Sequence, residues 1–200
     1  MASKPKVLCF AGSLRNDSFN KKLVKLAMTG AKEAGVDTTY IDLKEYPLPV
    51  YDGDYESEHG LPKNAQALKH LFFDHDGLLI ASPEYNSSVS AALKNVIDWV
   101  SRPADNSEKM LACFDDKVAG IMAASPGALG GLRGLIALRS ILGNIKVLVV
   151  PEQQAIAKSH EAFDQNGSLK DERQNASVKA IGAKVATICS ALAGEPVKAS

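Results

Sequence analysis

The chain has 200 residues, of which 46% are hydrophobic and 23% are charged, a composition typical of one globular domain with a sizeable buried core. Its 23 basic and 23 acidic side chains cancel. The sequence therefore lacks the basic excess of a nucleic-acid-binding protein and the acidic excess that small electron carriers use for docking.

The cysteines and the N-terminus bear on the cellular location. Cys9, Cys113 and Cys189 are far apart and form no CxxC pair, which favours free thiols in a reducing compartment. The first residues run into a strand-like segment without the apolar stretch of a signal peptide, and no segment approaches about 18 successive apolar residues. We expect a cytoplasmic protein without a membrane span.

Short apolar runs alternate with segments whose apolar residues recur at helical spacing. In chain order, the predicted elements are strand 6–12, helix 21–34, strand 37–43, helix 62–75, strand 77–82, helix 91–100, strand 117–124, helix 132–142, strand 145–150 and helix 173–192. The long segment 44–60 is expected to be an irregular loop with a functional or covering role. The fifth strand is expected to close at Pro151.

This strict alternation predicts a parallel sheet with helices on both faces. Right-handed crossovers leave few topologies, and five strands suit the flavodoxin-like order 2-1-3-4-5. No linker divides the sequence, so we expect residues 1–200 to form a single α/β domain, a three-layer sandwich.

The segment 12–20 joins the first strand to the first helix. A helix N-terminus offers free backbone N–H groups and a dipole that favours an anion. Ser13, Ser18 and Asn20 add neutral donors, and Arg15 adds a positive charge. This combination suits a phosphate monoester. The alternative is that Ser18 or Asn20 only caps the helix.

Two common nucleotide motifs do not match this segment. A Walker A loop would require Gly-Lys-Ser/Thr after Gly12, and a GxGxxG loop would require further glycines. Asp42 closes the second strand, where a dinucleotide-binding protein would hold a ribose, but without the glycines it is weak evidence for such a site.

Two other loops should lie beside the first, because ligands of such sheets bind at the carboxyl ends of the strands near the switch point. After the third strand, Pro83 ends the strand, and Tyr85 and Asn86 fall where a planar ligand could lie; the alternative is a surface turn. After the fourth strand, the segment 125–131 contains three glycines, which allow close approach of the backbone to a ligand or simply a tight turn.

Together the three loops resemble the NAD(P)H-dependent FMN reductase family, which includes chromate, azo-dye and quinone reductases of flavodoxin-like fold. Residues 12–20 match the family pattern Gly-Ser-x-Arg-x-x-Ser-x-Asn. Residues 83–86 match Pro-Glu-Tyr-Asn, and residues 93–99 match the second half of the same motif, Leu-Lys-Asn-x-Ile-Asp-Trp. Residues 125–131 match Ser-x-Gly-x-x-Gly-Gly. The family usually has Pro-Gly between the two halves of the second motif. This chain has Ser90-Ala91 there, two small residues that should leave the loop less rigid.

The resemblance implies FMN as the cofactor and assigns residues to its parts. The residues implied at the FMN phosphate are Ser13, Arg15, Ser18 and Asn20, with Phe19 in the same loop. Those implied at the isoalloxazine are Pro83, Glu84, Tyr85 and Asn86, largely through their backbone, with Ser125 and Gly127 closing the other side of the ring site.

The resemblance further implies an NAD(P)H:quinone oxidoreductase with ping-pong kinetics. NAD(P)H would pass a hydride to the flavin and leave, and a quinone or similar small acceptor, such as an azo dye or chromate, would take the same place and receive two electrons. Two alternatives stay open: an FMN reductase that supplies reduced flavin to a partner, and a non-catalytic FMN-binding electron carrier or sensor.

No protein side chain is expected to act as nucleophile or strong base, and no metal is expected. The histidines lie outside the three motifs, lack metal-ligand spacing and are expected to have surface or capping roles; they are His59, His70, His75 and His160. Because members of the family commonly form dimers, a homodimer is expected, and a tetramer is possible. Trp99 is expected to pack either in the core or at an interface. Trp99 and the aromatic residues of segment 46–55 are the expected contacts of a dimer.

Overall fold

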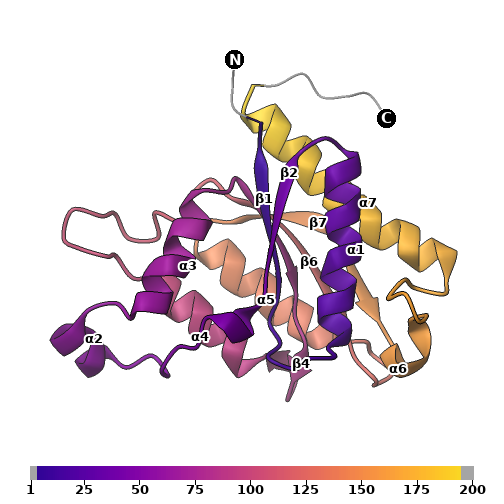
Figure 1. Cartoon of the computed structure of the whole chain (residues 1–200), viewed down its shortest axis with the longest axis horizontal. Coiled ribbons are helices and arrows are strands. Elements are labelled where there is room, and N and C mark those ends of the chain that lie inside the picture. Colours follow the sequence, from indigo (N-terminus) through magenta and orange to yellow (C-terminus); the bar gives the residue numbers. More distant parts are fainter. Residues whose placement is uncertain (1–3, 195–200) are drawn as a thin grey trace.

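A five-stranded parallel sheet forms the centre of the molecule (Figure 1). The computed structural model describes residues 4–194. The strands run in the order β2-β1-β3-β6-β7, and all neighbours are parallel. They are β1 (Lys6–Ala11), β2 (Asp37–Ile41), β3 (Gly77–Ala81), β6 (Val118–Ala124) and β7 (Leu148–Ile156). The predicted flavodoxin-like order 2-1-3-4-5 is confirmed, since β6 and β7 are the fourth and fifth strands of this sheet.

Helices cover both faces of the sheet, as Figure 1 shows. One face carries α1 (Phe19–Glu33) and α7 (Glu172–Leu192), and the other carries α3 (Lys63–Phe73), α4 (Ala91–Val100) and α5 (Leu132–Asn144). Successive side chains of a strand point to opposite faces. In β1, Val7 and Cys9 therefore join the core against α1 and α7, while Leu8 and Phe10 join the core against the other three helices.

The helices α1 and α7 approach each other so closely that their contact requires glycine. A Cβ added at Gly30 would lie 2.0 Å from the backbone oxygen of Lys179, and one added at Gly182 would lie 1.8 Å from that of Ala27. Any larger residue at either position would force the helices apart. This close packing fixes the C-terminal half of α1 against α7.

The prediction that the fifth strand closes at Pro151 is wrong. Strand β7 lies at the edge of the sheet and continues to Ile156. The register shifts between Ala119 and Ile121 of β6, and Pro151, which has no N–H, lies in this irregular part of β7. The guanidinium of Arg139 in α5 donates to the carbonyls of Val150 at 2.9 Å and Pro151 at 3.3 Å.

The segment 44–60, predicted to be irregular, contains helical structure. A 3-10 turn (Leu43–Glu45) follows β2, and α2 (Gly53–His59) follows a short extended stretch. Each begins at an aspartate whose side chain accepts a backbone N–H: Asp42 from Lys44 and Asp52 from Asp54. The capping role of Asp42, together with its ion pair to Lys21 at 2.5 Å, accounts for this residue without a ribose.

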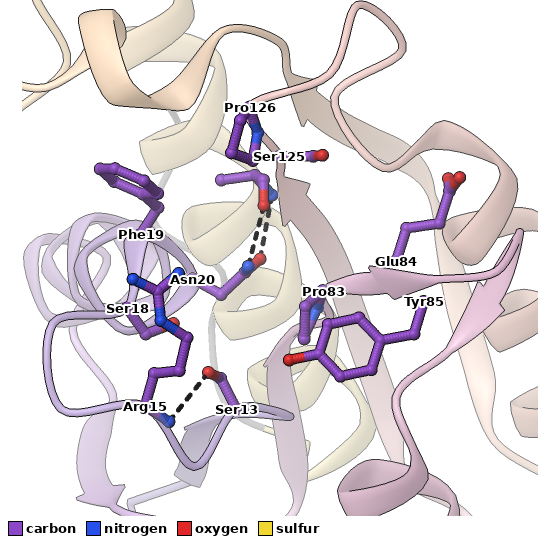
Figure 2. A pocket seen from close by; sticks show the side chains of 11 residues that line it. Ser13, Arg15, Ser18, Phe19, Asn20, Pro83, Glu84, Tyr85, Ser125 and Pro126 are labelled. Carbon is purple, nitrogen blue, oxygen red and sulfur yellow. Dashed lines mark hydrogen bonds between the residues drawn. The ribbon is translucent and has the colours of Figure 1, made fainter.

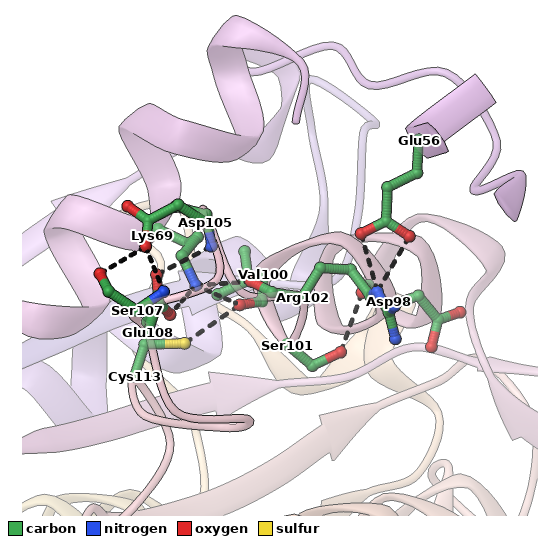
Figure 3. Close-up of polar contacts among 11 residues, drawn as sticks. Glu56, Lys69, Asp98, Val100, Ser101, Arg102, Asp105, Ser107, Glu108 and Cys113 are labelled. Carbon is green, nitrogen blue, oxygen red and sulfur yellow. Dashed lines mark hydrogen bonds and ion pairs between the residues drawn. The ribbon is translucent and has the colours of Figure 1, made fainter. Parts of the chain in front are cut away.

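Of the two roles expected for Trp99, core packing is confirmed and contact with a partner subunit is wrong, because Trp99 is completely buried. Its indole N–H donates to the carbonyl of Pro49 at 2.8 Å, and the ring packs edge-on against Tyr51. Arg102, just after α4, pairs with Glu56 of α2 at 2.9 Å (Figure 3). Trp99 and Arg102 thus hold segment 44–60 against α4.

The connection between α4 and β6 is held by a buried ion pair. Lys69 of α3 has a side chain that is 3% exposed, and its ammonium contacts the Glu108 carboxylate at 2.5 Å and the carbonyl of Arg102 at 2.7 Å (Figure 3). Cys113 donates its thiol hydrogen to the carbonyl of Val100 at 3.1 Å. These contacts join the start and end of the connection to α3 and α4.

The remaining elements are short. The strands β4 (Glu84–Tyr85) and β5 (Ser88–Val89) form an antiparallel hairpin after β3, and α6 (Ser159–Ala162) follows β7. None of them was predicted. Within residues 4–194, no helix is both long and apolar enough to cross a membrane.

Candidate functional site

The loops after β1, β3 and β6 meet at the carboxyl edge of the sheet and enclose a cavity of about 90 Å³ (Figure 2). The cavity is lined by Ser13, Arg15, Ser18, Phe19, Asn20, Pro83, Glu84, Tyr85, Ala124, Ser125 and Pro126. Every predicted site residue except Asn86 and Gly127 therefore belongs to this one cavity. Sequence reasoning missed Ala124 and Pro126, which have no polar side chain to mark them.

The first loop presents hydrogen-bond donors that are not used within the described chain. Ser18, a largely buried residue, occupies the N-cap position of α1, yet its hydroxyl makes no capping hydrogen bond. The backbone N–H groups of Phe19 and Asn20, in the first helical turn, have no intrahelical acceptor. The alternative that Ser18 merely caps the helix is therefore wrong.

Arg15 supplies the positive charge at this cavity. Its guanidinium makes no ion pair within 4.0 Å to a carboxylate of residues 4–194. Its backbone N–H donates to the hydroxyl of Ser13 at 3.3 Å, which shapes the turn between the two residues (Figure 2). The loop thus combines an uncompensated cation with free N–H donors.

The side chain of Asn20 connects the start of α1 to the end of β6. Its Nδ2 donates to the carbonyl of Ala124 at 2.9 Å, and its Oδ1 accepts the N–H of Ala124 at 2.9 Å (Figure 2). One hydrogen of Nδ2 and the Oδ1 are thus used in joining α1 to the end of β6. The second hydrogen of Nδ2 and the backbone N–H of Asn20 have no acceptor among the described residues and remain for an anion.

In the second loop, the carboxylate of Glu84 turns away from the cavity (Figure 2). It accepts hydrogen bonds from the N–H of Gly134 at 3.1 Å and from Arg133, whose Nη2 lies 2.6 Å away. Burial by itself raises the pKa of Glu84, but these hydrogen bonds and the positive charge of Arg133 outweigh it and hold the pKa below its ordinary value. Glu84 contributes backbone to the cavity, while its side chain holds the hairpin to α5.

Asn86 and Gly127 lie outside the cavity. Asn86 and Ser87 form the two-residue turn of the hairpin, and both have positive φ, 51° and 67°, as the mirror-image turns of tight hairpins require. The N–H of Gly127 donates to the hydroxyl of Ser125 at 3.2 Å, and its carbonyl accepts the N–H of Gly130 at 3.3 Å. The glycine thus closes the third loop on itself.

The third loop begins where β6 and the extended β7 end together. The N–H of Ser125 donates to the carbonyl of Ile156 at 3.0 Å, and the carbonyl of Ser125 accepts from Ser159 at 3.1 Å. The later part of β7, which the sequence did not predict, therefore supports this side of the cavity.

A second, more open cavity of about 370 Å³ adjoins the first and shares Arg15 and Tyr85 with it. Its other lining residues are Gly12, Leu14, Ser90, Ala91 and Ala92. A third cavity of about 160 Å³ continues from Leu14 and Ala92 toward Tyr46, Pro47 and Leu48 of the segment that covers α4. Tyr85 is 51% exposed, so its ring presents a broad surface beside these cavities.

The histidines lie outside all three cavities, and the described residues include no group of three or more acidic, cysteine or histidine side chains placed to hold a metal ion. For His75 the surface role is wrong, because the residue is buried, but the capping role is confirmed. Its ring bonds the carbonyl of Leu71, in the last turn of α3, at 2.6 Å and the hydroxyl of Thr39 at 2.7 Å. His75 therefore connects α3 to β2.

Comparison with known proteins assigns a family. The model of the family described as NADPH-dependent FMN reductase matches residues 5–161. The chain is 36% identical to NADPH:quinone oxidoreductase of Arabidopsis thaliana, over 86% of each chain, and 34% identical to 2-hydroxy-1,4-benzoquinone reductase of a Burkholderia species, over 84% of this chain and 86% of the relative. Among solved structures, the flavoenzyme NAD(P)H:(acceptor) oxidoreductase FerB of Paracoccus denitrificans superposes with a TM-score of 0.76 at 26% identity, covering 94% of this chain and 98% of FerB.

Proposed function

Since this chain belongs to the NADPH-dependent FMN reductase family of flavin oxidoreductases, we propose that it binds FMN at the two adjoining cavities and uses NAD(P)H to reduce quinones and similar small acceptors. The observation that carries the proposal is the convergence of the three loops on one cavity that combines Arg15 with unused N–H and hydroxyl donors.

The residues present fit a phosphate monoester. The small cavity offers the guanidinium of Arg15, the hydroxyl of Ser18 and the free N–H groups at the start of α1, and a helix N-terminus favours an anion. Asn20 would contribute its backbone N–H and the second hydrogen of its Nδ2, because the rest of its side-chain amide is bonded to Ala124. The ring system would lie beside Tyr85, which both cavities share, between the small cavity and the larger one.

When bound, FMN would supply the redox chemistry, accepting a hydride from the reduced nicotinamide and delivering two electrons to the acceptor. The chain would bind and orient. Backbone of Pro83 and Glu84 would line one side of the ring, and Ser125 with Pro126 the other. Leu14, Tyr85 and Ala92 would give nicotinamide and acceptor one shared, largely apolar surface, so we expect ping-pong kinetics and a broad acceptor range.

The test is to follow both half-reactions on the purified protein loaded with FMN. Without oxygen, NADPH should bleach the flavin spectrum, and a benzoquinone should restore it. A protein that stays colourless after incubation with FMN would overturn the flavin site. A yellow protein that NADPH cannot bleach would indicate an electron carrier or sensor instead of a reductase.

The family description, and a relative from Pseudomonas aeruginosa named an NAD(P)H-dependent FMN reductase at 35% identity, favour a second candidate, in which reduced FMN is released to a partner. Gel filtration under NADPH distinguishes the two functions. Flavin that stays with the protein supports the quinone reductase, and reduced flavin that elutes alone supports the supplier.

We also propose that the chain acts as a single domain and as a homodimer in the cytoplasm. The shared five-stranded sheet between the two core clusters supports the first point. The exposed Val50 and the partly exposed Tyr55 of segment 46–55 support the homodimer. The free, buried cysteines support a reducing compartment such as the cytoplasm. Light scattering that gives a monomer at working concentration would overturn the dimer.

A further inference from the structure

Ser90 connects the second loop to the first by a buried hydrogen bond. It is 1% exposed and occupies the N-cap position of α4, where its hydroxyl oxygen accepts the N–H of Leu93 at 3.2 Å. The same hydroxyl donates its hydrogen to the carbonyl of Gly12 at 2.5 Å. A serine hydroxyl has one hydrogen to give, so Gly12 is its sole acceptor.

Gly12 is fixed on its other sides as well. Its N–H donates to the carbonyl of Ala81 at the end of β3, at 2.9 Å. A Cβ added at Gly12 would lie 2.8 Å from the Cβ of Leu93, so the first turn of α4 packs directly on this residue. The bond from Ser90 to the carbonyl of Gly12 then holds the orientation of the peptide that joins Gly12 to Ser13.

The orientation of this peptide matters for the small cavity. In a planar trans peptide, the carbonyl oxygen and the following N–H point in opposite directions. Because the carbonyl of Gly12 points to Ser90, the N–H of Ser13 points away from Ser90, and Ser13 is one of the residues that line the small cavity. Within residues 4–194, no hydrogen-bond acceptor contacts this N–H.

We propose that Ser90 is a positioning residue that turns the N–H of Ser13 toward the phosphate of FMN. The inference rests on the proposed function, since it assumes that the small cavity holds this phosphate. It adds a residue of the second loop, remote from the phosphate itself, to the set that determines FMN affinity. This role also gives a reason for the hydrogen bond that the Ser90 hydroxyl donates to the first loop.

Riboflavin, which lacks the phosphate, separates this role from general packing. We would titrate apo-protein with FMN and with riboflavin by flavin fluorescence, for the parent and for Ser90→Ala. The loss of one orienting hydrogen bond should weaken FMN about fivefold to tenfold and leave riboflavin within about twofold. The matched control is Ser88→Ala, an exposed serine of the same hairpin whose hydroxyl makes no hydrogen bond among the described residues; it should change neither affinity.

Equal weakening of both flavins, or no change in either, would overturn the inference and leave the proposed function intact. A parent protein that binds neither flavin would overturn both. Melting curves without flavin establish that each variant is folded. Should Ser90→Ala fail to fold, Ser90→Cys keeps a similar volume with a weaker donor, and it should weaken FMN selectively by a smaller factor.

Discussion

At the scale of single residues, Glu84 shows how a motif side chain can hold a site together without facing it. Its carboxylate lies between the N–H of Gly134 and the guanidinium of Arg133, on the far side of the hairpin from the cavity. The side chain is 9% exposed, so these partners replace most of its water. It therefore contributes to the stability of the folded loop.

We expect Glu84→Gln to lower the free energy of unfolding by about 1 kcal/mol at pH 7. The folded-state pKa of Glu84 lies below its ordinary value near 4.5, so its contribution is fully present above that pH and is lost as the pH falls through the folded-state pKa. Urea unfolding at several pH values between about 7 and 3 measures the difference.

That difference between parent and variant should shrink only in the acid range. Glu152→Gln is the control, because Glu152 lies 3.7 Å from Lys184 with both side chains nearly half exposed. It should change stability by less than about 0.5 kcal/mol at every pH. A Glu84 effect that stays constant down to about pH 3 would contradict the ion-pair explanation.

At the scale of elements, the connection from α4 to β6 depends on the buried pair of Lys69 and Glu108. We expect Glu108→Gln to destabilise the protein by about 3 kcal/mol, because it leaves the Lys69 ammonium buried without a counter-charge. The control is Lys146→Gln, which breaks the ion pair between Lys146 and Asp115. That pair is also close, at 2.9 Å, but each side chain is about half exposed, so the free energy of unfolding should fall by less than about 1 kcal/mol. Urea unfolding compares the two, and equal losses would contradict the role of burial.

At the scale of the whole molecule, FMN should stabilise the fold because its site is made from three loops that come together only in the folded chain. At free FMN about a hundredfold above its Kd, the expected gain is about 2.7 kcal/mol, which raises Tm by roughly 5–11 °C for a chain of this size. A thermal melt with and without FMN measures it. Arg15→Ala at the same FMN concentration should show a smaller rise, and a parent without any rise would contradict binding to the folded state.

Much of this architecture follows from local pattern. The five apolar runs and the helical repeats between them predicted a parallel sheet, because parallel strands buried on both faces have continuous apolar sequences. Right-handed crossovers and the number of strands then favoured the observed order. The helix 91–100 has the predicted bounds, since Ser90 caps it and the apolar spacing is regular. The sequence also held a signal for α2: an N-cap residue, Asp52, acidic residues in the first turn, and Gly60 at the end. The prolines of the segment obscured this signal.

The sequence by itself determined the three loops, their position at the carboxyl edge of the sheet and the residue types that suit a phosphate and a planar ring. Only the tertiary structure decided where each side chain points. Asn20 bonds to Ala124, 104 residues away, Glu84 reaches Arg133 across the hairpin, and β7 passes Pro151 because Arg139 meets its free carbonyls. Such partners are chosen by packing between distant segments, which no local pattern of residues encodes.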